Sequence, residues 1–230
     1  MTEAEWLTAN EPKALLMFIW DVKSPRKVRL FAVACCCRLW HLLNDQLRQA
    51  VTTAEQFADG TEDQDKLTET CNSLKWDNGF ELPAEIPLGA FEAVSWAVLA
   101  DRGLYPSEAA SSAWWVLEGL FGREPLPVQE QEEQRRLAWR IEQGVQADMV
   151  RELFGNPFHP ITFAPAWRTS DVLLLARGIY EERAFDRTPI LADALQDAGC
   201  DSDDILNHLR DPHATHVRGC WALDLVLSKE

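Results

Sequence analysis

Apolar residues recur at spacings of three and four along most of the chain, which is the period of an α-helix with one buried face. The clearest stretch follows Ser24 and Pro25, a serine suited to the N-cap and a proline suited to the first helical turn. Its apolar stripe consists of Val28, Phe31, Ala32, Cys35, Leu39, Leu42 and Leu43. The spacing predicts a helix over 25–43.

The same period predicts further helices at 47–60, 91–100, 107–121, 129–154, 189–198, 202–210 and 217–227, with one more beginning after Thr169 or Ser170. In the longest of them, Leu137, Ile141, Val145 and Met149 mark the expected inner face. Gly199 stands where a helix commonly ends in the left-handed conformation.

No stretch alternates apolar and polar residues with an excess of β-branched side chains, as a strand would. The prediction is an all-α protein, an irregular bundle of roughly eight to ten helices with little or no β structure. We expect a single helical domain over 1–230. A break rich in glycine and proline at 122–127 would otherwise divide it into an N-terminal part, 1–127, and a C-terminal part, 128–230.

Composition and charge narrow the class of protein. Hydrophobic residues make up 47% and charged residues 26%, as in a folded globular chain. The net charge of -15 argues against nucleic-acid and anionic membrane partners, because phosphate binding depends largely on Lys and Arg. The acidic first residues do not resemble a signal peptide, and no run reaches the ~20 apolar residues that span a bilayer. Three of the six cysteines are consecutive, which favours free thiols and predicts a cytoplasmic protein.

Candidate chemistry concentrates near the C-terminus. Two cysteines and three of the five histidines fall between 200 and 220, namely Cys200, His208, His213, His216 and Cys220. Thiolate and imidazole are preferred ligands of zinc, and four of these five would complete a tetrahedral site. A zinc site here, used either by a metal-binding domain or by a metalloenzyme, is therefore an alternative hypothesis for this stretch.

Each of these residues also has a structural interpretation. Cys200 follows Gly199, at the position where an apolar side chain packs back on its own helix. Cys220 would serve as a small hydrophobe beside Trp221. Two weaker candidates are single pairs at helical spacing: Cys37 with His41 as a thiolate–imidazole pair, and Asp193 with Asp197 for acid–base chemistry, both more typical of structural positions.

Motifs for nucleotide binding, serine hydrolysis and zinc proteolysis do not occur in the sequence, so no reaction is predicted. The ten tryptophans suggest large buried rings, some of which would contact a protein partner. The leading hypothesis is a non-enzymatic helical module for protein interaction or regulation. The alternatives are the zinc-binding domain and an acidic mimic of nucleic acid that occupies a basic protein.

Two groups of short segments, one near each end of the chain, resemble the sequences of a known protein family. They comprise residues 1–7, 29–36 and 39–43, and residues 154–158, 179–183, 189–195, 198–201 and 216–221. Together these resemble a family of uncharacterised proteins abundant in planctomycete bacteria. The resemblance implies a bacterial protein whose terminal blocks form one core around a variable middle segment. It also implies a basic residue in relatives where this chain has Cys37, which argues against Cys37 as a ligand.

Overall fold

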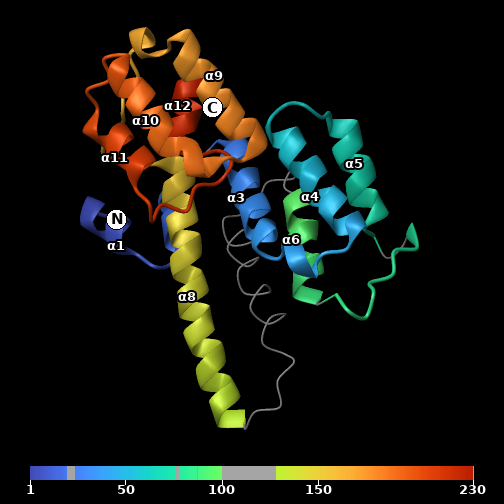
Figure 1. Cartoon of the computed structure of the whole chain (residues 1–230). Helices are drawn as coiled ribbons and strands as arrows, with labels where there is room; N and C mark the ends of the chain where they lie inside the picture. Colours follow the sequence, from blue (N-terminus) through green and yellow to red (C-terminus); the bar gives the residue numbers. More distant parts are fainter. Residues whose placement is uncertain (20–23, 76–77, 87, 100–127, 230) are drawn as a thin grey trace. The chain divides into compact units, whose positions relative to one another are not determined.

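The computed structural model describes residues 1–19, 24–75, 78–86, 88–99 and 128–229. Every regular element in these residues is a helix, and no strand occurs among them, which confirms the all-α prediction. Figure 1 shows the helices in chain order. The helix predicted at 107–121 lies outside the described residues.

The chain divides into two compact units. The first, which we call unit 1, runs from residue 1 to 148, and the second, unit 2, from 149 to 230, with Thr2 grouped with unit 2. The boundary therefore falls inside the long helix α8 (Val128–Phe154), whereas the pattern of breaking residues placed a division at 127. The N-terminal blocks of the planctomycete resemblance belong to unit 1 and the C-terminal blocks to unit 2.

Unit 1 begins with two short helices, α1 (Glu3–Thr8) and α2 (Pro12–Phe18). Its core lies among α3 (Pro25–Arg38), α4 (Asp45–Ala58), α5 (Gln64–Ser73) and α6 (Leu88–Leu99). Helices α3, α4 and α6 all pack against one another, and α5 packs against α4 and α6. The apolar stripes of these amphipathic helices meet in one buried cluster, as the helical period predicts.

Helix α3 begins as predicted, with Ser24 Oγ accepting the backbone N–H of Lys27 at the N-cap. It ends at Arg38, and a 3-10 turn, η1 (Trp40–Leu42), follows. The predicted single helix over 25–43 is thus broken, although Leu39 and Leu43 remain buried.

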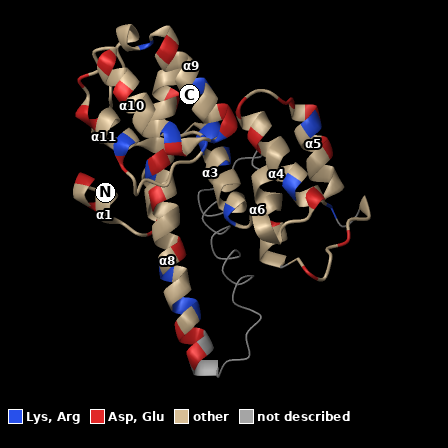
Figure 2. Ribbon diagram, viewed as in Figure 1, with Lys and Arg blue, Asp and Glu red and all other residues tan. Residues whose placement is uncertain are grey.

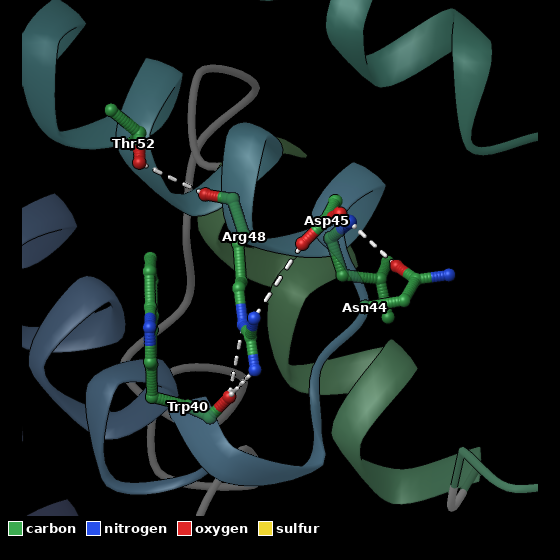
Figure 3. A network of polar contacts seen from close by, with 6 residues as sticks. Trp40, Asn44, Asp45, Arg48 and Thr52 are labelled. Carbon is green, nitrogen blue, oxygen red and sulfur yellow. Dashed lines mark hydrogen bonds and ion pairs between the residues drawn. The ribbon is translucent and has the colours of Figure 1, made fainter.

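Arg48 on α4 contacts the 3-10 turn that follows α3, as Figure 3 shows. Its guanidinium donates from Nε and Nη2 to the carbonyl oxygen of Trp40, at 3.3 and 3.2 Å, and lies over the indole ring. Asn44 Oδ1 accepts the N–H of Leu47 and starts α4. The Asn44 cap is local to the sequence, but only folding brings Arg48 to the Trp40 carbonyl, which also accepts the backbone N–H of Leu43.

Unit 2 contains α9 (Ser170–Glu182), α10 (Thr188–Asp197), α11 (Asp203–Arg210) and α12 (Trp221–Leu227), with two 3-10 turns, η3 (Pro165–Trp167) and η4 (Phe185–Arg187). Helix α10 packs against α9 and α11, and α12 against α9 and α11. The four helices surround a second buried cluster, centred on residues such as Ile179, Leu191 and Leu223. Figure 1 shows them grouped together in orange and red.

Local signals set the ends of these helices. Thr169 Oγ1 accepts the N–H of Val172 and caps α9. Gly199 ends α10 at φ +88°, where the N–H of Gly199 bonds the carbonyl of Gln196 and the N–H of Cys200 bonds that of Leu195. This is the glycine-terminated Schellman arrangement, in which the residue after the glycine packs back on the helix. Cys200 does so and is buried, as its structural interpretation predicted.

The buried face of α8 agrees with the predicted one at Met149, which is 2% exposed, but not at the two predicted positions nearest the start of the helix. Leu137 and Ile141 are exposed by 57% and 60%. Glu142 and Gln146 are instead buried, since Glu142 pairs with Arg38 and accepts the side-chain N–H of Gln146. Side chains that satisfy one another can be buried in place of apolar ones, which hydrophobic periodicity does not detect.

Acidic and basic residues are interspersed along the described part of α8, as Figure 2 shows. Arg136 pairs with Glu132 one turn away, an exposed contact of the kind that contributes little to stability. Within the described residues, no helix is long and apolar enough to cross a membrane.

Candidate metal centre

Glu152 lies in the last turn of α8, inside unit 2. Met149, Val150 and Leu153 on the same turns are buried, and this apolar face carries the Glu152 side chain into the interior, where only 4% of it is exposed. A buried carboxylate requires charged or hydrogen-bonding partners, because its desolvation is costly. The partners of Glu152 are two histidines.

His208 lies on α11, one helical turn from Ile205 and next to Leu209, both fully buried. This strongly amphipathic helix therefore turns His208 inward. His216 and Cys220 belong to the connection that leads into α12, with Cys220 at its N-cap. Gly219 adopts φ +90° just before Cys220, and the Cys220 N–H bonds the carbonyl of Val217. This turn brings a fully buried thiol back beside α11.

The four side chains converge. His216 Nδ1 lies 3.0 Å from Glu152 Oε1, and His208 Nε2 lies 3.3 Å from Glu152 Oε2. The same His208 nitrogen lies 3.4 Å from Cys220 Sγ. One donor atom from each of the four residues lies within 4.8 Å of the other three. We call Glu152, His208, His216 and Cys220 the ECHH cluster.

These separations are close to those of a tetrahedral zinc site. With zinc bonds of about 2.0–2.3 Å, neighbouring ligand atoms lie about 3.3–3.6 Å apart. The contacts of His208 Nε2 with Glu152 Oε2 and with Cys220 Sγ, at 3.3 and 3.4 Å, are near this edge length. No pair exceeds 4.8 Å, so movements of about 1 Å would complete the shell.

The arrangement does not suit a cysteine–histidine catalytic triad. In such a triad one imidazole nitrogen faces the thiol and the other faces the carboxylate. Here His208 Nε2 faces both Cys220 Sγ and Glu152 Oε2, and the thiol is fully buried. The close approach of thiol, imidazole and carboxylate donor atoms instead matches the ligand types and spacing of a zinc site.

Burial and charge shift two pKa values within the cluster. Burial alone would raise the pKa of the Glu152 carboxyl, but hydrogen bonds and charge from His208 and His216 outweigh it and lower that pKa. Burial and the neighbouring Glu152 carboxylate raise the pKa of the Cys220 thiol well above its ordinary value. In the metal-free protein, therefore, Glu152 is an anion and Cys220 a neutral thiol at neutral pH.

If a metal binds at this cluster, the thiol predicts how its affinity depends on pH. A metal binds the thiolate, so binding must displace the Cys220 proton. Because the raised pKa lies above neutrality, the zinc association constant should rise about tenfold per pH unit between about pH 7 and 8.5 from this proton alone. Competition with a chromophoric chelator measures that slope. A zinc affinity independent of pH in this range would show that Cys220 is not a ligand.

The structure unites three of the five residues predicted from the sequence, His208, His216 and Cys220. Cys200 and His213 do not belong to the cluster. Cys200 packs in the core beside the end of α10, and His213 is exposed in the connection after α11. Cys200 and Cys220 therefore have different surroundings although they lie close in sequence. The turn at Gly199 places Cys200 in the core, and the turn at Gly219 places Cys220 in the cluster.

Glu152, which lies 64 positions before His216, was not predicted as a site residue. One signal could have revealed it. Glu152 falls between Met149 and Leu153 on the apolar face of a helix, and a carboxylate at such a position requires an explanation.

The two other candidate pairs do not form comparable groups in the described residues. The helix that carries Cys37 ends at Arg38, so His41 falls in the 3-10 turn and the helical spacing is lost. Asp193 is exposed and pairs with Arg210 Nη2 at 2.6 Å, a surface ion pair between α10 and α11.

Comparison of the chain with protein-family models, curated proteins and solved structures found no match. The resemblance to a planctomycete family stays a prediction. The geometry of the ECHH cluster is therefore the basis for a proposed function.

Proposed function

We propose that unit 2 is a metal-binding helical domain that holds one divalent transition-metal ion, with zinc as the preferred ion, through Glu152, His208, His216 and Cys220. The observation that carries the proposal is the convergence of four ligand-type side chains within 4.8 Å in the interior. Imidazole and thiolate favour zinc over hard cations such as magnesium and calcium, which prefer oxygen ligands.

The charges of the donor set fit a divalent ion. Glu152 supplies one negative charge, and Cys220 supplies a second once its proton leaves, while the histidines bind as neutral groups. The complex is then neutral overall, which matters because the side chains of Glu152 and His216 are only 4% and 6% exposed. Burial of an uncompensated charge would be costly.

One buried nitrogen of the cluster has no hydrogen-bond partner and would be satisfied by a bound metal ion. His216 Nε2 is buried and accepts or donates no hydrogen bond, although Nδ1 of the same ring faces Glu152. An unsatisfied buried polar group costs about 1–3 kcal/mol. Histidines that bind metals commonly use one nitrogen for the ion and the other for a carboxylate. The His216–Glu152 contact provides the second of these.

Four protein ligands favour a structural role for the ion. A catalytic zinc site usually has three protein ligands and an open position for water, whereas structural sites are closed. The ECHH ligands come from the end of α8, from α11 and from the connection between α11 and α12. A metal would tie these segments together, so its binding free energy would add to the stability of unit 2.

The hypothesis of a protein-interaction or regulatory module, with a protein partner, is compatible with such a domain and stays a prediction. The acidic mimic of nucleic acid gains no support from α8, where basic side chains separate the acidic ones (Figure 2). We propose no reaction, and the cytoplasmic location likewise stays a prediction.

Metal analysis of the purified protein tests the proposal. We expect about one zinc per chain by mass spectrometry after expression with zinc, and a full equivalent taken up by chelator-treated protein. His216→Gln should lose this zinc, whereas His213→Gln should retain it because His213 is exposed and outside the cluster. A wild-type protein that binds neither zinc, cobalt, iron nor copper would overturn the proposal.

A further inference from the structure

We propose that Gly155 and Trp221 are positioning residues of the metal centre, which hold the cluster's ligands in register without binding the ion themselves. The inference rests on the proposed function and deepens it. It assigns to two residues outside the ECHH cluster a measurable effect on metal affinity and on the geometry of the bound ion.

Trp221 touches the site at two points. Its ring lies 4.8 Å from the His208 ring, centroid to centroid, at an angle of 42°. It also directly follows Cys220 and begins α12. The indole therefore restricts rotation of the His208 ring, whose Nε2 must face Glu152 and Cys220 at the same time. Displacement of the Trp221 ring would also shift the adjacent backbone of Cys220 and therefore its thiol.

The Trp221 indole packs against the backbone of Gly155. It follows α8 at φ +68°, and its N–H bonds the carbonyl of Arg151. A Cβ at this position would lie 3.3 Å from Trp221 Cγ, 3.5 Å from Cδ2 and 3.7 Å from Cβ. The closest of these contacts is tighter than ordinary van der Waals contact, so any side chain would press on the rigid base of the indole.

The contact links all three ligand-bearing segments. Gly155 lies three residues after Glu152, directly after the end of α8, while Trp221 contacts the His208 ring and directly follows Cys220. A displacement of Trp221 would change the positions of two ligands relative to the third. Residues that orient metal ligands typically change metal affinity about 10–100-fold when they are altered.

Unit 2 also contains a matched control. Gly199 ends α10 at φ +88°, and a Cβ there would meet nothing within 4 Å. Gly155→Ala and Gly199→Ala both place an L side chain in the left-handed region after a helix, so both have the same kind of backbone strain. Only Gly155→Ala adds a contact with Trp221.

The experiment compares cobalt binding by the wild type, G155A, G199A, W221F and W221A. Cobalt serves as the probe because its visible absorption reports the number and arrangement of ligands, and competition with a chelator gives the affinity. We expect G155A and W221A to bind cobalt about 10–100-fold more weakly than the wild type, with altered spectra. G199A should keep the wild-type affinity and spectrum even though its unfolding midpoint falls. W221F, which retains an aromatic ring beside His208, should recover most of the affinity.

The outcomes separate the two proposals. If the wild type binds no cobalt or zinc, the proposed function is wrong and this inference fails with it. If the wild type binds cobalt while G155A and W221A match G199A in affinity and spectrum, the metal site stands and the positioning role is overturned. Should W221A fail to fold, G155A against G199A decides alone, because both retain the indole.

Discussion

A Cys220→Ser protein is expected to lose zinc and, with it, the part of the stability of unit 2 that depends on zinc. Serine has nearly the volume of cysteine, but its hydroxyl is a poor zinc ligand. At a free zinc concentration 1,000 times the dissociation constant, a bound ion stabilises the folded state by about 4 kcal/mol. We expect this increment in the wild type and almost none in the variant.

The measurement is urea unfolding of both proteins with zinc and with excess chelator. With chelator present, the two should differ only by the smaller cost of a hydroxyl at a buried position, about 1–3 kcal/mol. The test of Cys220 as a ligand is therefore the difference in unfolding free energy with and without zinc. The absolute stability of the variant does not test it.

Cys200→Ser is the matched control. Cys200 is a buried thiol of the same unit whose pKa is raised by burial, and it lies outside the ECHH cluster. It should lose packing energy yet keep the full zinc-dependent increment. A Cys200→Ser protein without zinc, or a Cys220→Ser protein with a full equivalent, would contradict the assignment of ligands.

The second large effect is expected in unit 1, where Arg38→Met should destabilise the fold by about 2–3 kcal/mol. Arg38 contacts Glu142 through two nitrogens, with Nε at 2.9 Å from Oε1 and Nη2 at 2.6 Å from Oε2. The side chain of Glu142 is only 5% exposed, so the variant would leave its carboxylate buried without the guanidinium. Arg38 itself is 36% exposed, and solvent screening places the loss below that of a fully buried pair.

A double-mutant cycle distinguishes this mechanism from lost packing. The double variant Arg38→Met with Glu142→Met removes both charges and should recover most of the stability, because two apolar side chains can replace a buried ion pair. Denaturant unfolding of the four proteins gives the coupling energy. An Arg38→Met variant within about 0.5 kcal/mol of the wild type would show that the pair contributes no more than an ordinary surface contact.

The sequence predicted the helices well where the signals are local. The Ser24 cap, the Thr169 cap and the Gly199 terminus each depend on residues within four or five positions, and the structure confirms all three. The helical period likewise predicted the all-α class. Such signals act before any tertiary contact exists, so they can be read directly from the chain.

The errors occurred where distant parts of the chain decide the environment. Leu39 to Leu43 have helical apolar spacing, yet α3 stops at Arg38 and a 3-10 turn follows, whose Trp40 carbonyl accepts from both Leu43 N–H and Arg48. Leu137 and Ile141 follow the period of a buried face, yet they are exposed. Glu142 is buried nearby because Arg38 neutralises it from 104 positions away. Propensity and periodicity contain no information about such partners.

The ECHH cluster shows the same division most clearly. By itself, the sequence determined that unit 2 is helical and that its last stretch is rich in thiol and imidazole groups. Only the tertiary structure decided which of them meet: His208, His216 and Cys220 turn toward Glu152, while Cys200 packs in the core and His213 faces solvent. The physical reason is that a ligand set is defined by distances of a few ångströms between side chains. Those distances depend on how α8, α11 and α12 pack, and chain spacing does not fix them.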